Sequence, residues 1–200
     1  MIKNVVFDFG QVLVHFEPKY MVGAYVIDQN DGVLLEKVVF DRLYWDRLDA
    51  GTITDEEMLS ECCKRLPERL WDVARKIYYN WIYNIPEIDG MRELIKYIKK
   101  QYSPRVLVLS NISHYFADHK DEIPILKEAD GYVFSSKIGV TKPKKEIFDH
   151  LCQKFNFSPN EAVFIDDNQS NCEGARALGF TAYQFDGNAK ALKDYLDTIL

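Results

Sequence analysis

The sequence has few of the features that would set it apart from ordinary globular proteins. Its 200 residues contain no apolar run long enough to cross a membrane, and the first residues lack the pattern of a signal peptide. Lysine and arginine form no long basic run, and the net charge is −6. Because nucleic acids and anionic membranes bind clustered basic side chains, we expect neither as a partner.

Cysteine is also scarce, and its spacing is uninformative. The four cysteines show neither a C-x-x-C spacing nor a Cys/His pattern typical of zinc sites. We therefore expect reduced thiols rather than disulfides or zinc ligands, as is usual for a cytoplasmic protein. The cysteines are Cys62, Cys63, Cys152 and Cys172.

What the sequence does contain is a series of short apolar segments rich in β-branched residues. They are hydrophobic on both faces, which is typical of buried parallel strands. Helical patterns separate the last four segments: Asp89 is placed to cap the first helix, and Gly179 to end the helix over 170–178 in a left-handed conformation. This alternation predicts an α/β fold with a doubly wound, Rossmann-like parallel sheet. The expected strands are 5–7, 105–109, 132–135, 162–165 and 181–185.

One connection is much longer than a strand crossover requires, since about ninety residues separate the first two strands. Inside it, Thr54 and Glu57 predict a capping box at the start of a helix. We expect a helical-bundle cap over 16–86, inserted into a core domain formed by 1–15 and 87–200. Aromatic residues crowd this insertion and are expected to form its core: Tyr44, Trp45, Trp71, Tyr78, Tyr79, Trp81 and Tyr83.

Polar residues follow the predicted strands at the points where the strands end. Each of them alone is an ordinary turn former, helix cap or surface charge. In open parallel sheets, however, ligands bind outside the carboxyl ends of the strands, so we expect this set to meet in one crevice. The residues are Asp8, Ser110, Asn111, Lys142, Asp166 and Asp167.

The residue types in this set favour phosphoryl transfer. Three carboxylates around a small space suit a hard cation such as Mg²⁺, and Gly10 can add its backbone carbonyl as a ligand. With Lys142 the cation would neutralise a phosphate dianion, so that Asp8 can attack phosphorus. Ser110 and the backbone amide of Asn111 suit the remaining phosphoryl oxygens. We therefore expect a Mg²⁺-dependent phosphatase that forms an aspartyl phosphate.

At these positions the sequence resembles the haloacid dehalogenase superfamily over nearly its whole length. The resemblance lies in a strand ending at Asp8, a strand ending at Ser110, Lys142 before a proline, and a strand ending in the pair Asp166-Asp167. The inserted bundle resembles the cap of many members. The local sequences around these motifs are similar to those of a subgroup that includes bacterial sugar-phosphate phosphatases such as glucose-1-phosphate phosphatase.

This resemblance implies a role for each site residue and a class of substrate. Asp8 and Asp166 would bind Mg²⁺ directly. Asp167 would contact the metal ligands or a metal-bound water rather than the ion itself. The cap would select a small phosphomonoester such as a sugar phosphate. The phosphate itself would be held by Ser110, Asn111 and Lys142.

The chain departs from the family pattern at one position. Most phosphatases of the family carry a second aspartate two residues after the nucleophile, and it protonates the leaving group; here that position is Gly10. Losing a general acid usually costs on the order of 10²- to 10⁴-fold in rate. His15 and Glu17 are the nearby candidates for a proton donor.

Other functions remain open at this point. One is a protein that binds phosphate or a partner without turnover, and another is a metal-independent 2-haloacid dehalogenase. A mutase is less favoured because it needs the acid that Gly10 replaces. A signalling receiver domain is excluded, since its acid pair comes before the nucleophile.

Overall fold

The five predicted strands form a single parallel sheet. In the computed structural model, which describes all 200 residues, the strand order is β3-β2-β1-β4-β5. The strands pair in parallel throughout, with Val5 of β1 aligned to Val106 of β2 and to Val163 of β4. Their bounds are β1 Asn4–Phe7, β2 Arg105–Ser110, β3 Gly131–Phe134, β4 Ala162–Asp166 and β5 Thr181–Gln184.

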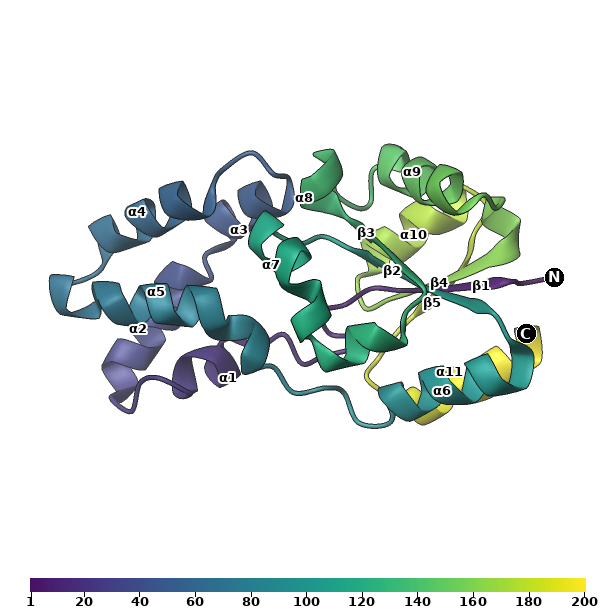
Figure 1. Cartoon of the computed structure of the whole chain (residues 1–200), viewed down its shortest axis with the longest axis horizontal. Coiled ribbons are helices and arrows are strands. Elements are labelled where there is room, and N and C mark those ends of the chain that lie inside the picture. Colours follow the sequence, from purple (N-terminus) through teal and green to yellow (C-terminus); the bar gives the residue numbers. More distant parts are fainter.

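Helices cover both faces of this sheet (Figure 1), so the predicted doubly wound α/β fold is confirmed. Alternate residues of β1 serve the two faces: Val5 and Phe7 pack in one hydrophobic cluster, and Val6 packs in the other. On one side lie α6 (Met91–Tyr102) and α11 (Ala189–Ile199), and on the other lie α9 (Lys145–Phe155) and α10 (Gln169–Ala177). No helix is both long enough and apolar enough to span a membrane.

Short helices connect the strands of the core. One group follows β2 and leads to β3, one helix follows β3, and a single turn precedes β4. Their bounds are α7 His114–His119, η3 Lys120–Glu122, η4 Pro124–Glu128, α8 Ser135–Ile138 and η5 Pro159–Glu161.

The segment between β1 and α6 is helical and forms a separate lobe beyond the carboxyl ends of the strands (Figure 1). The predicted capping box is present, because the Thr54 hydroxyl accepts from the Glu57 amide and the Glu57 carboxylate accepts from the Thr54 amide. The helices are α1 Pro18–Gly23, α2 Gln29–Val39, α3 Arg42–Asp49, α4 Asp55–Arg65, η1 Glu68–Leu70, α5 Trp71–Asn80 and η2 Trp81–Tyr83.

Aromatic packing joins this lobe to the sheet domain. Trp81 is fully buried, and its ring stacks on that of Phe116 of α7 with centroids 5.4 Å apart. The ring of Phe116 in turn packs on that of Phe9, which follows β1, with centroids 4.7 Å apart. The expectation that every aromatic of the segment is internal was wrong: Trp71 is 40% exposed and Tyr83 is 52% exposed.

The start of α6 and the end of α10 can be compared with the capping residues that the sequence predicted. Asp89 does not cap α6, because the N-cap is Gly90 at φ +82°, where the backbone turns through a conformation that favours glycine. Gly179 has φ +93° after the end of α10, so the expected left-handed residue is confirmed there.

Trp81 should contribute more to stability than the exposed Trp71. Because its ring is surrounded by other aromatic rings, Trp81→Ala should leave a cavity and lower the free energy of unfolding by about 3–5 kcal/mol. Trp71→Ala is the matched control and should lower it much less. Urea unfolding of the two variants measures the difference, and equal losses would contradict this account of how the lobe is held.

Candidate active site

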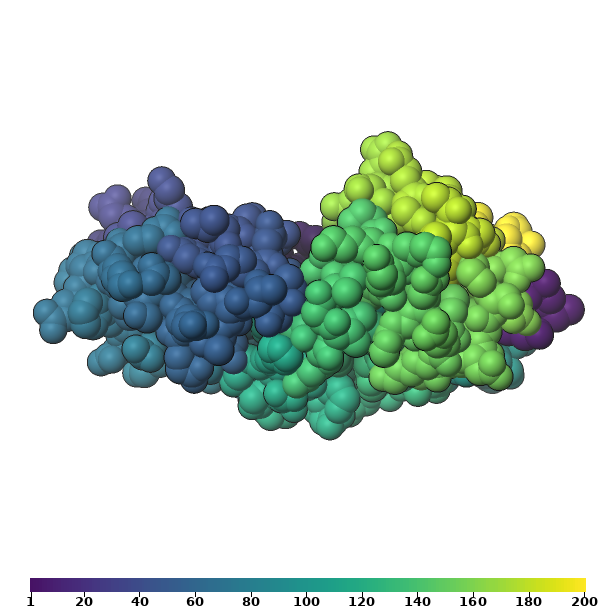
Figure 2. All heavy atoms as spheres, turned by 90° about the horizontal axis from the view of Figure 1, so that it is seen from above, coloured from purple at the N-terminus to yellow at the C-terminus, as the bar shows by residue number.

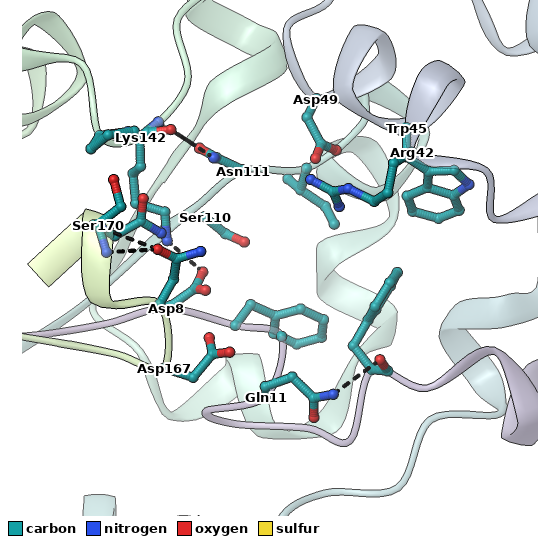
Figure 3. Close-up of a pocket in the computed structure, with 17 residues that line it drawn as sticks. Asp8, Gln11, Arg42, Trp45, Asp49, Ser110, Asn111, Lys142, Asp167 and Ser170 are labelled. Atoms are coloured by element: carbon teal, nitrogen blue, oxygen red, sulfur yellow. Dashed lines mark hydrogen bonds and ion pairs between the residues drawn. The ribbon is translucent and has the colours of Figure 1, made fainter. Parts of the chain in front are cut away.

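A cavity of about 320 Å³ opens at the carboxyl ends of the strands, facing the helical lobe. The space-filling view shows the surface hollowed between the two lobes (Figure 2). The close-up shows side chains from both lobes around the cavity (Figure 3). Six of the predicted site residues line it, namely Asp8, Gly10, Ser110, Asn111, Lys142 and Asp167.

The Lys142 ammonium lies between two carboxylates. Its Nζ is 2.8 Å from Asp8 Oδ1 and donates to Asp166 Oδ2 at 2.7 Å. The side chains of Lys142 and Asp166 are almost completely buried. Because a buried charge is costly unless it is paired, this arrangement fixes the nucleophile candidate against a cation.

Burial and charge act in opposite directions on these groups. Burial raises the pKa of Asp8 to about 7; the Lys142 ammonium opposes the rise, and the Asp166 carboxylate adds to it. Burial alone would lower the pKa of Lys142, but the two carboxylates outweigh it and hold that pKa above its usual value. Lys142 is therefore charged at neutral pH, and further positive charge at the site would favour ionised Asp8.

Asn111 fixes the backbone of Lys142. Its side-chain oxygen accepts from the Lys142 amide at 2.8 Å, and its side-chain nitrogen donates to the Lys142 carbonyl at 3.2 Å. Asn111 follows β2, whereas Lys142 comes from a loop beyond β3, so this pair of bonds ties two strand ends together. The sequence predicted that Asn111 contacts phosphate; the structure adds that its side chain positions the lysine.

The two acids at the end of β4 differ in their surroundings. Asp166 has no exposed surface, and its oxygens accept from Lys142, from the Asn168 amide and from the Asn171 side chain at 3.0 and 3.1 Å. Asp167 is only partly buried and lines the cavity; burial, followed by the neighbouring Asp166, raises its pKa above the usual value. Asp167 is therefore the acid that faces the cavity.

The carboxylates fit a single hard cation. Ligand atoms from Asp8, Asp166 and Asp167 all lie within 4.8 Å of one another. An all-oxygen set of this kind suits Mg²⁺ or Ca²⁺ rather than a metal that prefers sulfur or imidazole. A divalent ion there would also relieve the repulsion between neighbouring acids.

The helical lobe contributes side chains that sequence reasoning missed. Arg42, Trp45 and Asp49 of α3 line the cavity from the side opposite the strand ends (Figure 3). Their spacing of three and four residues places them on one face of the helix, which is the signal that the sequence offered. Asp49 is 6% exposed, and its Oδ1 has no hydrogen-bond partner.

The two nearby proton-donor candidates lie elsewhere. The side chain of Glu17 forms an ion pair with Lys19. The ring of His15 packs against Tyr20, with centroids 6.4 Å apart. Neither His15 nor Glu17 is among the residues that line the cavity.

The order of the strands, the four polar strand ends and the inserted helices together define a class of enzyme. The model of the haloacid dehalogenase-like hydrolase family matches residues 2–179, and the chain belongs to this family.

Particular relatives share nearly the whole chain. The D-ribitol-5-phosphate phosphatase of Bacteroides thetaiotaomicron is 27% identical over 203 residues, which cover 94% of each chain. A haloacid dehalogenase family enzyme of the same organism, solved with magnesium and inorganic phosphate, superposes with a TM-score of 0.68 at 19% identity, covering 96% of this chain and 99% of that one. The L-2-haloacid dehalogenase of Xanthobacter autotrophicus superposes with a TM-score of 0.68 at 18% identity, and the match covers 100% of this chain and 84% of that one. These two structural likenesses show a shared fold.

Asp49 should make the stability of the protein depend on pH. Burial raises its pKa from 3.8 to about 7, while Arg42 opposes the rise and Asp46 and Asp8 add to it. The folded protein therefore binds this proton more tightly than the unfolded chain, and the resulting stability is lost as pH rises from about 4 to about 7. Asp49→Asn should remove this dependence, so that from pH 5 to pH 8 the variant gains roughly 2–3 kcal/mol relative to the wild type.

Urea unfolding at the two pH values measures this gain. Asp72→Asn, which changes an exposed carboxylate of the same lobe, is the matched control and should show no such gain. A pH dependence that is identical in the wild type and Asp49→Asn would show that Asp49 is ionised normally.

Proposed function

We propose that the protein is a Mg²⁺-dependent phosphatase that hydrolyses a small phosphorylated metabolite through an aspartyl phosphate on Asp8. The observation that carries this proposal is the contact between Asp8 and the buried Lys142 at the floor of the cavity. A carboxylate needs no base to act as a nucleophile, but it needs positive charge beside it before it can approach a phosphate dianion.

The cavity offers partners for each part of a bound phosphate. Lys142 supplies charge, and the Ser110 hydroxyl and the Asn111 backbone amide are proposed to donate to the outer oxygens. An Asp8 oxygen attacks phosphorus in line with the bond to the leaving group. That bond breaks, and water later cleaves the aspartyl phosphate to release inorganic phosphate.

Asp8, Asp167 and the carbonyl of Gly10 are proposed to hold Mg²⁺, which when bound would neutralise charge on the phosphoryl oxygens. The oxygens of Asp166 already accept hydrogen bonds from Lys142, from the Asn168 amide and from the Asn171 side chain. We therefore propose that Asp166 orients the lysine rather than binding the ion. This exchanges the roles that the resemblance implied for the two adjacent acids.

The relatives support a sugar or polyol phosphate as substrate. The ribitol-5-phosphate phosphatase aligns over 94% of both chains, and a cavity of about 320 Å³ fits a molecule of that size. The polar lining, including Gln11, Asn168 and Ser170, also suits a hydroxylated ligand better than a hydrocarbon.

The dehalogenase alternative is less well supported, although a dehalogenase shares the fold. A haloacid carries its own carboxylate, and the cluster of Asp8, Asp166 and Asp167 would repel it in the absence of a metal. A non-catalytic protein is also disfavoured, because buried charges such as Lys142 and Asp166 are costly to retain without a use.

Asp8→Asn should abolish hydrolysis of p-nitrophenyl phosphate, because an amide is too weak a nucleophile to form the phosphoryl intermediate. The far-ultraviolet circular dichroism should stay that of the wild type, since the amide occupies the same volume. Asp72→Asn should retain full activity. Turnover by Asp8→Asn close to that of the wild type would remove Asp8 from its proposed role.

Metal dependence can be measured both by activity and by binding. EDTA should stop hydrolysis, and added Mg²⁺ should restore it. Mg²⁺ should also raise the melting temperature of the wild type, while Asp167→Asn should lose most of this response and Asp72→Asn should keep it. Hydrolysis that is indifferent to chelation would overturn the proposed role of Mg²⁺.

A further inference from the structure

A phosphatase acting on an alcohol phosphate needs a proton at the leaving oxygen, and the strand ends do not supply an obvious donor. The residue two positions after Asp8 is Gly10, which has no side chain. An alkoxide is a poor leaving group, so the missing proton should cost on the order of 10²- to 10⁴-fold in rate. The following inference rests on the proposed phosphatase function and concerns how this gap is filled.

Asp49 is the one carboxyl of the helical lobe that lines the cavity. It is the last residue of α3, lies on the same helix face as Trp45, and is directed into the cavity from the side opposite the strand ends (Figure 3). Its Oδ1 is sealed from solvent and receives no hydrogen bond. A carboxyl group that is buried without donors is stabilised in its protonated form.

The surrounding charges leave this preference in place. Arg42 and Asp46 of the same helix partly cancel, because they form an ion pair with each other. From across the cavity, Asp8 and Lys142 act in opposite senses on Asp49. With burial as the largest effect, the pKa of Asp49 rises to about 7, so a large share of the molecules carry this proton at neutral pH.

The backbone of Asp49 is tied to the loop that is proposed to bind phosphate. The Ser135 hydroxyl donates to the Asp49 carbonyl at 2.5 Å and accepts from the Ile112 amide at 2.9 Å. Ile112 directly follows Asn111, so one buried hydroxyl links the two sides of the cavity. Although Asp49 comes from the insertion, its backbone is therefore anchored to the sheet domain beside this loop.

We propose that Asp49 is the catalytic proton donor that serves in place of a carboxyl at position 10. As the Asp8 oxygen bonds to phosphorus and the bond to the leaving oxygen breaks, Asp49 gives its proton to that oxygen and an alcohol leaves. The Asp49 carboxylate then takes a proton from water while the water oxygen attacks phosphorus. The bond to Asp8 breaks, phosphate leaves, and Asp49 is protonated again.

The variant Asp49→Asn separates the two halves of this cycle. With glycerol phosphate, whose leaving group needs a proton, kcat should fall by about 10²- to 10⁴-fold. With p-nitrophenyl phosphate, whose leaving group is a stable anion, one equivalent of p-nitrophenol should appear at close to the wild-type rate, followed by slow turnover. For the wild type acting on glycerol phosphate, kcat/KM should decline as pH rises through the pKa of the acid, and this decline should be absent in the variant.

Three outcomes would overturn the inference: no loss with glycerol phosphate, an equal loss in the first turnover of both substrates, or a decline with pH that persists in the variant. An equal loss would indicate that Asp49 acts only on the structure of the site. Asp72→Asn is the control and should match the wild type with both substrates. If the wild type itself hydrolyses neither substrate, the proposed phosphatase function fails, whereas an active wild type with an unaffected variant rejects only the role of Asp49.

Discussion

The contact of the Lys142 ammonium with Asp8 and Asp166 is the constraint on which the rest of the site depends. All three groups are withdrawn from water, so each would be costly alone, and the pairing makes their burial tolerable. The strand order supports this pairing, because β1 lies between β2 and β4 and the ends of three neighbouring strands meet. Asn111 holds the loop that carries the lysine, so the cation is placed by backbone contacts as well as by charge.

The acids of the site differ in the hydrogen bonds that they already accept from the protein. Asp166 accepts from an ammonium, a backbone amide and the side chain of Asn171, and it is fully satisfied without a ligand. Asp167 faces the cavity, and the sealed Oδ1 of Asp49 lacks a donor. Such acids reduce stability in the free protein, and a protein retains them where a ligand or a reaction uses them. Asp167 and Asp49 therefore remain available to a ligand in the cavity.

The strands and their polar ends could be predicted because both signals are local. A buried parallel strand is apolar on both faces, and Asp8, Ser110 and the acid pair follow such segments directly. Asp49 and Asn171 could not be found in this way, since their roles depend on which helix face meets the cavity. The expectations for Trp71, Tyr83 and Asp89 failed for a related reason. The hydrophobic character of a residue, or its preference for helix caps, does not specify which side chains a neighbouring element covers.

The boundaries of the inserted cap, residues 16–86, remain a prediction.

The two lobes divide the chemistry between them. The strand ends hold the groups that are proposed to act on the phosphoryl group, whereas α3 presents Arg42, Trp45 and Asp49 to the opposite side of the cavity, where the rest of a substrate would lie. Because Trp81 and Phe116 join the lobes in one continuous core, α3 is held against the cavity by packing rather than by a ligand. On the proposed mechanism, substitutions on this helix face would change the leaving group that is accepted and leave phosphate binding intact. The proposed nucleophile is held by charge pairing, whereas the proposed proton donor is held by packing and by the hydrogen bond from Ser135 to its carbonyl, so the two can vary independently.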